Sequence, residues 1–164
     1  MTQENQYKIL LVCTGNTCRT AMAEGIGKNV AKEKNLNNVI FSSAGTSAAP
    51  GMPATDYAIA ASAHWDIDIS GHRSRLLNQD LIKEADLILA MGPEHVQVIV
   101  NIDRNALAKT YLYKGFPEPF HPSQARVDDP IGGSLDMYNQ TFLELDEVMR
   151  RIFPKIAEFA QTNA

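Results

Sequence analysis

The chain has 164 residues, of which 45% are hydrophobic and 21% charged. This length is enough to bury a hydrophobic core, and we expect a single domain spanning residues 1–164. Its formal net charge of −4 lacks the basic excess that nucleic-acid binding requires, and its N-terminal stretch resembles neither a signal peptide nor a membrane span. We therefore expect a cytoplasmic monomer with no nucleic-acid or membrane partner.

Predicted strands and helices alternate along the chain. A short apolar run at 7–12 precedes a segment whose apolar residues recur at helical spacing, and similar pairs follow downstream. The predicted strands are 7–12, 38–46, 85–91 and 109–114, and the predicted helices are 20–34, 54–65, 78–84, 93–104 and 134–160, the last capped by Ser134 and bent at Pro154. The alternation predicts an α/β, doubly wound domain with helices on both faces of a parallel sheet.

The loop between the first strand and the first helix has the composition of an anion site. It reads CTGNTCRT over residues 13–20 and opens a helix, whose N-terminal N–H groups attract phosphate. It lacks the second glycine and the lysine of nucleotide-binding loops. We expect a phosphoryl group to be held by Thr14, Gly15, Asn16, Thr17, Cys18, Arg19 and Thr20, with Gly15 permitting a tight turn.

Two residues of this loop suit covalent phosphoryl transfer. A Cys13 thiol beside a helix N-terminus and an arginine is expected to have a lowered pKa and to act as a thiolate nucleophile. Arg19 can bind two phosphoryl oxygens at once. The chemistry also needs a general acid, and the long proline-rich segment 115–133 offers Asp129, which the following proline holds extended, with Asp128 as the competitor.

The Cys-x5-Arg-[Ser/Thr] loop and the late Asp-Pro pair resemble the low-molecular-weight protein tyrosine phosphatase family. The similarity runs from about Tyr7 to the last helix and includes SSAGT and HRSRLL. It implies a four-stranded sheet in the order 2-1-3-4 and a phosphorylated protein or peptide substrate. It also implies that Cys13 is the nucleophile, Arg19 the phosphate clamp and Asp129 the general acid, without a metal or other cofactor.

The resemblance assigns further roles around the loop. Asn16, Thr20, Ser43 and His72 are expected to brace it by hydrogen bonds. Cys18 is expected either to form a reversible disulfide with Cys13, which would protect the nucleophile, or to be a buried thiol. The remaining histidines match nothing in the family and are expected in solvent; they are His64, His95 and His121.

Substrate specificity is expected to depend on three positions. Ala49 and Ile131 occupy places where tyrosine-specific members carry aromatic residues, although Phe116 or Phe120 could substitute for those rings. Thr17 replaces a bulky aliphatic residue, and CTGNTCR with DPIGGS resembles the protein-arginine phosphatases of the family. We favour phosphoarginine over phosphotyrosine.

Three other functions stay open at this point. The first is a protein tyrosine phosphatase proper. The second is a thioredoxin-coupled arsenate reductase, which shares the Cys, Cys and Arg spacing but uses further downstream cysteines that this chain lacks after Cys18. The third is a non-catalytic phosphate-binding module.

Overall fold

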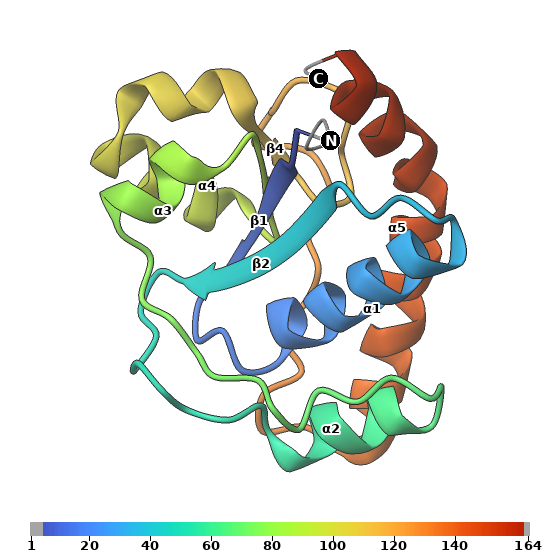
Figure 1. Ribbon diagram of the computed structural model, residues 1–164. Coiled ribbons are helices and arrows are strands. Elements are labelled where there is room, and N and C mark those ends of the chain that lie inside the picture. The colour runs from blue at the N-terminus through green and yellow to red at the C-terminus, as the bar shows by residue number, and fades with distance from the viewer. Residues whose placement is uncertain (1–4, 163–164) are drawn as a thin grey trace.

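The computed structural model describes residues 5–162 and forms a parallel four-stranded sheet between two layers of helices (Figure 1). In the order β2-β1-β3-β4 the strands are Val39–Gly45, Tyr7–Cys13, Leu87–Ala90 and Thr110–Leu112. The helices are α1 (Arg19–Glu33), α2 (Asp56–Ala63), α3 (Gln79–Glu84), α4 (Pro93–Ile102) and α5 (Leu135–Thr162), with a 3-10 helix η1 at Arg104–Lys109. The predicted α/β fold and the strand order 2-1-3-4 are confirmed.

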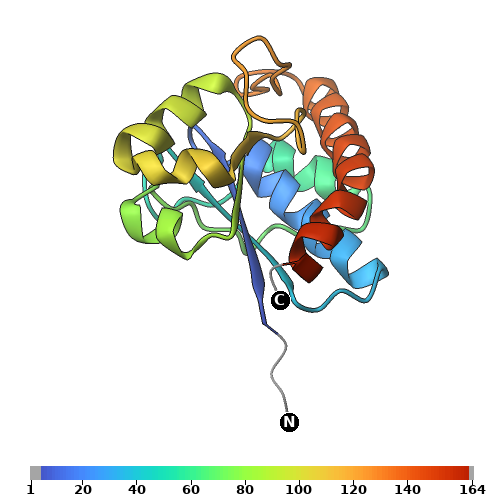
Figure 2. The same ribbon diagram turned by 90° about the horizontal axis from the view of Figure 1, so that it is seen from above.

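The central strand β1 is buried on both faces because successive side chains point to opposite sides of a sheet. Ile9, Leu11 and Cys13 pack in the core that α1, α2 and α5 cover. Leu10 and Val12 pack in the second core, under α3, α4 and η1, and Figure 2 shows the two layers on either side of the sheet. The nucleophile candidate therefore ends the strand on the face that α1 covers.

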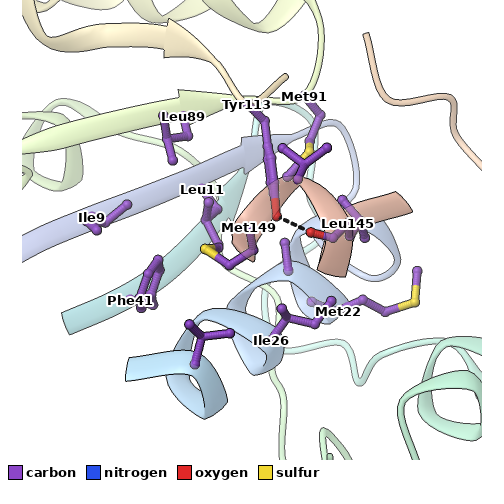
Figure 3. Close-up of a cluster of buried hydrophobic side chains, with 14 of the residues drawn as sticks. Ile9, Leu11, Met22, Ile26, Phe41, Leu89, Met91, Tyr113, Leu145 and Met149 are labelled. Carbon is purple, nitrogen blue, oxygen red and sulfur yellow. Dashed lines mark hydrogen bonds between the residues drawn. The ribbon is translucent and has the colours of Figure 1, made fainter. Parts of the chain in front are cut away.

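The core between the sheet and α5 also holds one buried polar group. Met22 and Ile26 of α1 pack there with Leu145 and Met149 of α5 (Figure 3). The hydroxyl of the fully buried Tyr113 donates a hydrogen bond of 2.6 Å to the carbonyl oxygen of Leu145. Because buried polar groups need partners, this bond fixes the segment after β4 against α5.

Helix α5 is the longest element, with 28 residues. The Ser134 hydroxyl accepts a hydrogen bond from the Met137 N–H, which confirms the predicted cap. The helix continues through Pro154, so the proline does not end it. Buried residues recur at helical spacing along α5, with charged residues between them. No helix within residues 5–162 is long and apolar enough to cross a membrane.

The carboxyl edge of the sheet gathers the functional segments. There β1 ends at Cys13, and residues 14–18 lead directly into α1. The neighbouring strand β2 ends beside it at Gly45, paired with Cys13. Ligands of open α/β sheets bind at this edge, where the chain leaves the central strand in both directions.

Candidate active site

Cys13 lies at the floor of the site and is 2% exposed. Its Sγ lies 2.9 Å from the Thr20 hydroxyl and accepts a hydrogen bond of 3.3 Å from the N–H of Asn16. Burial raises the pKa of the Cys13 thiol, while the contacts with Thr20 and Asn16 and the charge of Arg19 lower it. The predicted net lowering is therefore wrong in direction, because the loss of solvent outweighs these contacts.

Asn16, and not Gly15, supplies the unusual backbone conformation of the loop. Its φ of 59° is left-handed, which asparagine tolerates better than most residues. Its Oδ1 accepts from the Arg75 N–H at 2.8 Å, and its Nδ2 donates to Thr20 Oγ1 at 2.8 Å and to Ser43 Oγ at 2.9 Å. The buried amide thus holds the turn through three hydrogen bonds.

These bonds also orient the Thr20 hydroxyl. Its oxygen accepts from Asn16, so its proton is left to donate to the sulfur of Cys13. A hydroxyl that donates to sulfur stabilises the thiolate more than the thiol. The phosphate loop thereby carries a built-in donor for the charged nucleophile.

Further hydrogen bonds hold Asn16 and its partner Ser43 in place. His72 donates from Nε2 to the Asn16 carbonyl oxygen at 2.6 Å, and the Ser43 hydroxyl donates to Glu24 Oε1 at 2.7 Å. The Arg75 Nε donates to the Ser43 carbonyl oxygen at 3.1 Å. The structure therefore places His72 and Ser43 at the loop, together with Glu24 and Arg75, which no spacing in the sequence had singled out.

The end of β2 approaches the loop so closely that only glycine fits. A Cβ at Gly45 would lie 2.4 Å from the Thr14 carbonyl oxygen. Beyond it, the N–H of Thr46 donates to the Cys13 carbonyl at 2.9 Å and the N–H of Ser47 to the Thr14 carbonyl at 3.0 Å. In the sequence, the SSAGT stretch indicated only the family resemblance, and no role was predicted for its glycine, Gly45.

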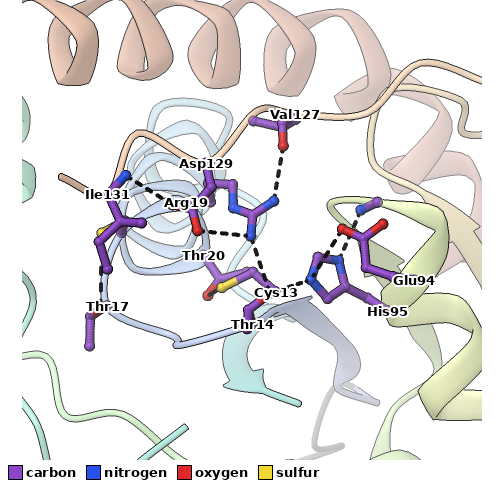
Figure 4. A network of polar contacts seen from close by, with 12 residues as sticks. Cys13, Thr14, Thr17, Arg19, Thr20, Glu94, His95, Val127, Asp129 and Ile131 are labelled. Carbon is purple, nitrogen blue, oxygen red and sulfur yellow. Dashed lines mark hydrogen bonds and ion pairs between the residues drawn. The ribbon is translucent and has the colours of Figure 1, made fainter. Parts of the chain in front are cut away.

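Arg19 is a nearly buried cation, 3% exposed, held between two loops (Figure 4). Its Nη1 donates to the Val127 carbonyl oxygen at 3.0 Å, and its Nη2 donates to Thr14 Oγ1 at 3.4 Å. Nη2 also lies 3.5 Å from Asp129 Oδ2. The arginine therefore links the phosphate loop to the distant segment that carries the candidate acid.

Asp129 is the aspartate that reaches the site. Its side chain is 38% exposed, and its Oδ1 accepts from the N–H of Ile131 at 3.1 Å. Both aspartates line a hollow against α5, next to Met137, but only Asp129 also lines the hollow at Cys13. Of the two candidates for the general acid, the geometry favours Asp129.

A small hollow with a volume of about 20 Å³ opens above the sulfur. It is lined by Cys13, Gly15, Asn16, Thr17, Cys18, Arg19, Asp129 and Ile131. Of these, Ile131 is a large apolar residue that is 62% exposed. Among the described residues no aromatic side chain lines this hollow.

The proposed aromatic substitutes lie elsewhere. Phe116 is 1% exposed and packs edge-on against Tyr111 and Phe159. Phe120 lines another hollow, beside η1 and Tyr111. The suggestion that either ring could wall the substrate is therefore wrong. Ala49 is exposed, accepts a hydrogen bond from Ser74 through its carbonyl, and stays a prediction as a specificity position.

Cys18 is buried beside the site with partners of its own. Its Sγ lies 3.2 Å from the Tyr138 hydroxyl and 3.6 Å from the Thr55 hydroxyl. Burial, together with Cys18, raises the pKa of Tyr138 to about 12, so the phenol keeps its proton. Cys13 and Cys18 are both free thiols, and their disulfide stays a prediction.

His95 is a site residue that the sequence did not identify. It was expected in solvent, but it is 1% exposed, because α4 places it against the phosphate loop. Its Nε2 lies 2.9 Å from Thr14 Oγ1, and its Nδ1 accepts from the Gly92 N–H at 3.0 Å. His64 and His121 are exposed, as expected. Across residues 5–162, no three His, Cys, Asp or Glu side chains are grouped so that they could hold a metal ion.

Comparison with known proteins agrees with this geometry. The family model described as low molecular weight phosphotyrosine protein phosphatase matches residues 8–162. A protein-arginine-phosphatase of Bacillus subtilis (strain 168) is 40% identical over 144 residues, covering 88% of this chain and 93% of the relative. The low molecular weight protein-tyrosine-phosphatase Etp of Escherichia coli (strain K12) is 33% identical over 138 residues, covering 80% and 90%.

A solved structure extends the similarity to the backbone. The structure of YwlE arginine phosphatase, as a mutant with a phosphorylated active site serine, aligns with a TM-score of 0.84 at 37% identity. The alignment covers 92% of this chain and 95% of that one. Sequence and fold agree over nearly the whole length, and the chain belongs to the low molecular weight phosphotyrosine protein phosphatase family.

Proposed function

We propose that this protein is a phosphatase that hydrolyses a phosphorylated protein side chain through a phosphocysteine, and that phosphoarginine is its favoured substrate. The observation that carries the proposal is the convergence of Cys13, Arg19 and Asp129 on one hollow of the phosphate loop. A nucleophile, a cation for the phosphoryl oxygens and a proton donor are the three groups that covalent phosphoryl transfer requires.

The first step transfers the phosphoryl group to sulfur. Burial favours the protonated thiol of Cys13, so its proton must leave as the phosphoryl group enters, and the Asp129 carboxylate faces the same hollow and can accept it. The thiolate attacks phosphorus, an S–P bond forms, and the bond from phosphorus to the substrate nitrogen or oxygen breaks. Asp129 then passes the proton to that leaving atom.

The second step hydrolyses the phosphocysteine. A water attacks phosphorus while Asp129 takes one of its protons, and the S–P bond breaks to release inorganic phosphate. The sulfur leaves as a thiolate, which the Thr20 hydroxyl at 2.9 Å stabilises by donation. Arg19 stabilises the charge on the transferred oxygens in both steps. The phosphorylated serine in the YwlE mutant supports a covalent route in this family.

The walls of the hollow support phosphoarginine. Thr17 of the phosphate loop and Ile131 beside it both line the hollow, and neither can stack on a phenol ring. Stacking of an aromatic pair contributes about 0.5–1.5 kcal/mol beyond area burial, which a phosphotyrosine substrate would forgo here. The protein-arginine-phosphatase of Bacillus subtilis supports the same substrate class by its similarity.

The second candidate is a protein tyrosine phosphatase, favoured by the similarity to Etp. The arsenate reductase and the non-catalytic module have no support in the site beyond the phosphate loop itself. In each case we expect the chain to act as a cytoplasmic monomer, where a reducing environment keeps Cys13 and Cys18 as the free thiols described above.

One experiment separates these functions. Release of inorganic phosphate from two peptides of matched sequence, one carrying phosphoarginine and one phosphotyrosine, is measured at neutral pH for the wild type and for Cys13→Ser. We expect a higher kcat/KM for phosphoarginine and no turnover by Cys13→Ser. A preference for phosphotyrosine would make it a tyrosine phosphatase. Turnover of neither peptide would contradict a protein phosphatase of either kind.

A further inference from the structure

A chain of hydrogen bonds joins α4 to the phosphate clamp, and its directions are fixed by the donors available (Figure 4). The Gly92 N–H can only donate, so Nδ1 of His95 must accept and carries no proton. The neutral ring then has its proton on Nε2, which donates to Thr14 Oγ1 at 2.9 Å. The tautomer of His95 is therefore set by the first turn of α4.

The Thr14 hydroxyl links His95 to Arg19. Its oxygen accepts from His95 and also from Arg19 Nη2 at 3.4 Å, so both of its lone pairs are occupied. The other terminal nitrogen of Arg19 donates to the Val127 carbonyl oxygen at 3.0 Å. Two acceptors on separate segments thus hold the guanidinium from outside the hollow.

We propose that His95 is a positioning residue for the phosphate clamp: its Nε2–H holds Thr14 Oγ1 as an acceptor, and Thr14 in turn sets the orientation of Arg19 toward the bound phosphoryl group. The proposal deepens the proposed function and rests on it for the identity of that anion. His95 itself does not touch the reacting atoms.

The charges around His95 keep it in the required neutral form. Burial, followed by the charge of Arg19, lowers the pKa of His95 to about 4. Arg126 acts in the same direction, whereas the carboxylates of Glu94 and Asp129 oppose it. Protonation would place a hydrogen on Nδ1 against the Gly92 N–H, and the ring could no longer serve both partners.

The acidic partner of this histidine also connects to the loop of the acid. Glu94 Oε1 lies 3.8 Å from His95 Nε2 and pairs with the guanidinium of Arg126. Arg126 stands three residues before Asp129 in the chain. His95 therefore lies beside the ion pair of Glu94 and Arg126, which ties the segment carrying the acid to α4.

Two substitutions separate the positioning role from a purely structural one. In His95→Asn, the shorter amide can still accept from the Gly92 N–H but cannot reach Thr14. In His95→Gln, the amide nitrogen can take the place of Nε2 and donate to Thr14, while the cap of α4 is lost. A role limited to capping α4 predicts that His95→Gln suffers more, whereas a positioning role predicts that His95→Asn suffers more.

The test measures the dissociation constant of inorganic phosphate by calorimetry at pH 7, with kcat/KM on an aryl phosphate as a second readout. We expect His95→Asn to weaken phosphate binding by about tenfold, equivalent to one hydrogen bond, and His95→Gln to recover most of the loss. Thr14→Val should weaken binding similarly, and adding His95→Asn to it should bring little further loss.

The outcomes are distinct from those for the proposed function. Unchanged phosphate binding in His95→Asn would overturn the positioning role, as would equal losses in both His95 variants that follow their melting temperatures. Additive losses in the double variant with Thr14→Val would also overturn it. If the wild type hydrolyses no phosphorylated side chain but binds phosphate with the expected pattern, the positioning role stands and the proposed function fails.

Discussion

The carboxylate of Asp129 lies 3.5 Å from the guanidinium of Arg19, so the candidate acid and the candidate clamp form an ion pair across the hollow. The arginine is 3% exposed and the aspartate side chain 38% exposed, so the cation is fixed and the carboxylate faces water. A substrate phosphoryl group would take over part of the charge pairing of Arg19. The Asp129 carboxylate is then free to accept and donate protons.

Asp129→Asn should lower kcat by about 10²- to 10⁴-fold, because an amide keeps the shape of the side chain but cannot transfer a proton. The loss should grow as the leaving group becomes more basic, which steady-state kinetics on a series of aryl phosphates will measure. The matched control is Asp128→Asn, whose side chain does not line the hollow at Cys13 and which should leave kcat nearly unchanged. Equal losses for good and poor leaving groups would remove Asp129 from the role of acid.

Thr20→Ala should raise the pKa of Cys13 further, because the variant loses a hydroxyl that donates to the sulfur. The hydrogen bond favours the thiolate, so its removal shifts deprotonation to higher pH. The measurement is the rate of iodoacetamide alkylation against pH, compared with Thr20→Ser, which keeps the hydroxyl and should resemble the wild type. An unchanged or lower midpoint in Thr20→Ala would contradict the assigned direction of the hydrogen bond.

Asn16→Ala should destabilise the fold by roughly 2–4 kcal/mol, because it removes three side-chain hydrogen bonds and leaves buried partners unpaired. Asn35→Ala is the matched control, since Asn35 is exposed and also left-handed, with φ of 56°. The control should lose only about 1 kcal/mol through backbone strain. Urea unfolding monitored by circular dichroism compares the two, and equal losses would mean that the side-chain bonds of Asn16 contribute little.

Thr17→Ile should lower the preference for phosphoarginine over phosphotyrosine, because it fills the wall of the hollow with a bulky aliphatic group and removes a hydroxyl. The readout is the ratio of kcat/KM for the two matched phosphopeptides. We expect a several-fold change in that ratio, with phosphate affinity retained. An unaltered ratio would show that Thr17 does not determine specificity.

The fold, and the gathering of Cys13, Arg19 and Asp129 at one hollow, could be predicted because their signals are local. Alternating apolar runs and helical periodicity set the order of elements, and CTGNTCRT with Asp-Pro indicated Cys13, Arg19 and Asp129. The brace formed by Asn16, Thr20, Ser43 and His72 followed from family resemblance. In the structure all four lie in one hydrogen-bonded set.

What escaped prediction depends on contacts between distant segments. His95 reaches Thr14 only because β1 and β3 are neighbours in the sheet, and a histidine in the first turn of a helix carries no such signal. The net pKa shift of Cys13 depends on how much water the packing removes, which spacing cannot reveal. Gly15 was expected to permit the tight turn because glycine has the freest backbone, but the residue with the left-handed backbone is Asn16.

Backbone hydrogen bonds connect the phosphate loop to its surroundings. The N–H groups of Thr46, Ser47 and Thr55 donate to the carbonyl oxygens of Cys13, Thr14 and Thr17, respectively. Such a loop cannot fray separately from the sheet that carries it. The amide protons of Thr46, Ser47 and Thr55, which donate these bonds, should therefore exchange with deuterium only when the loop and its surroundings open together, and the pocket should persist until that cooperative unit melts.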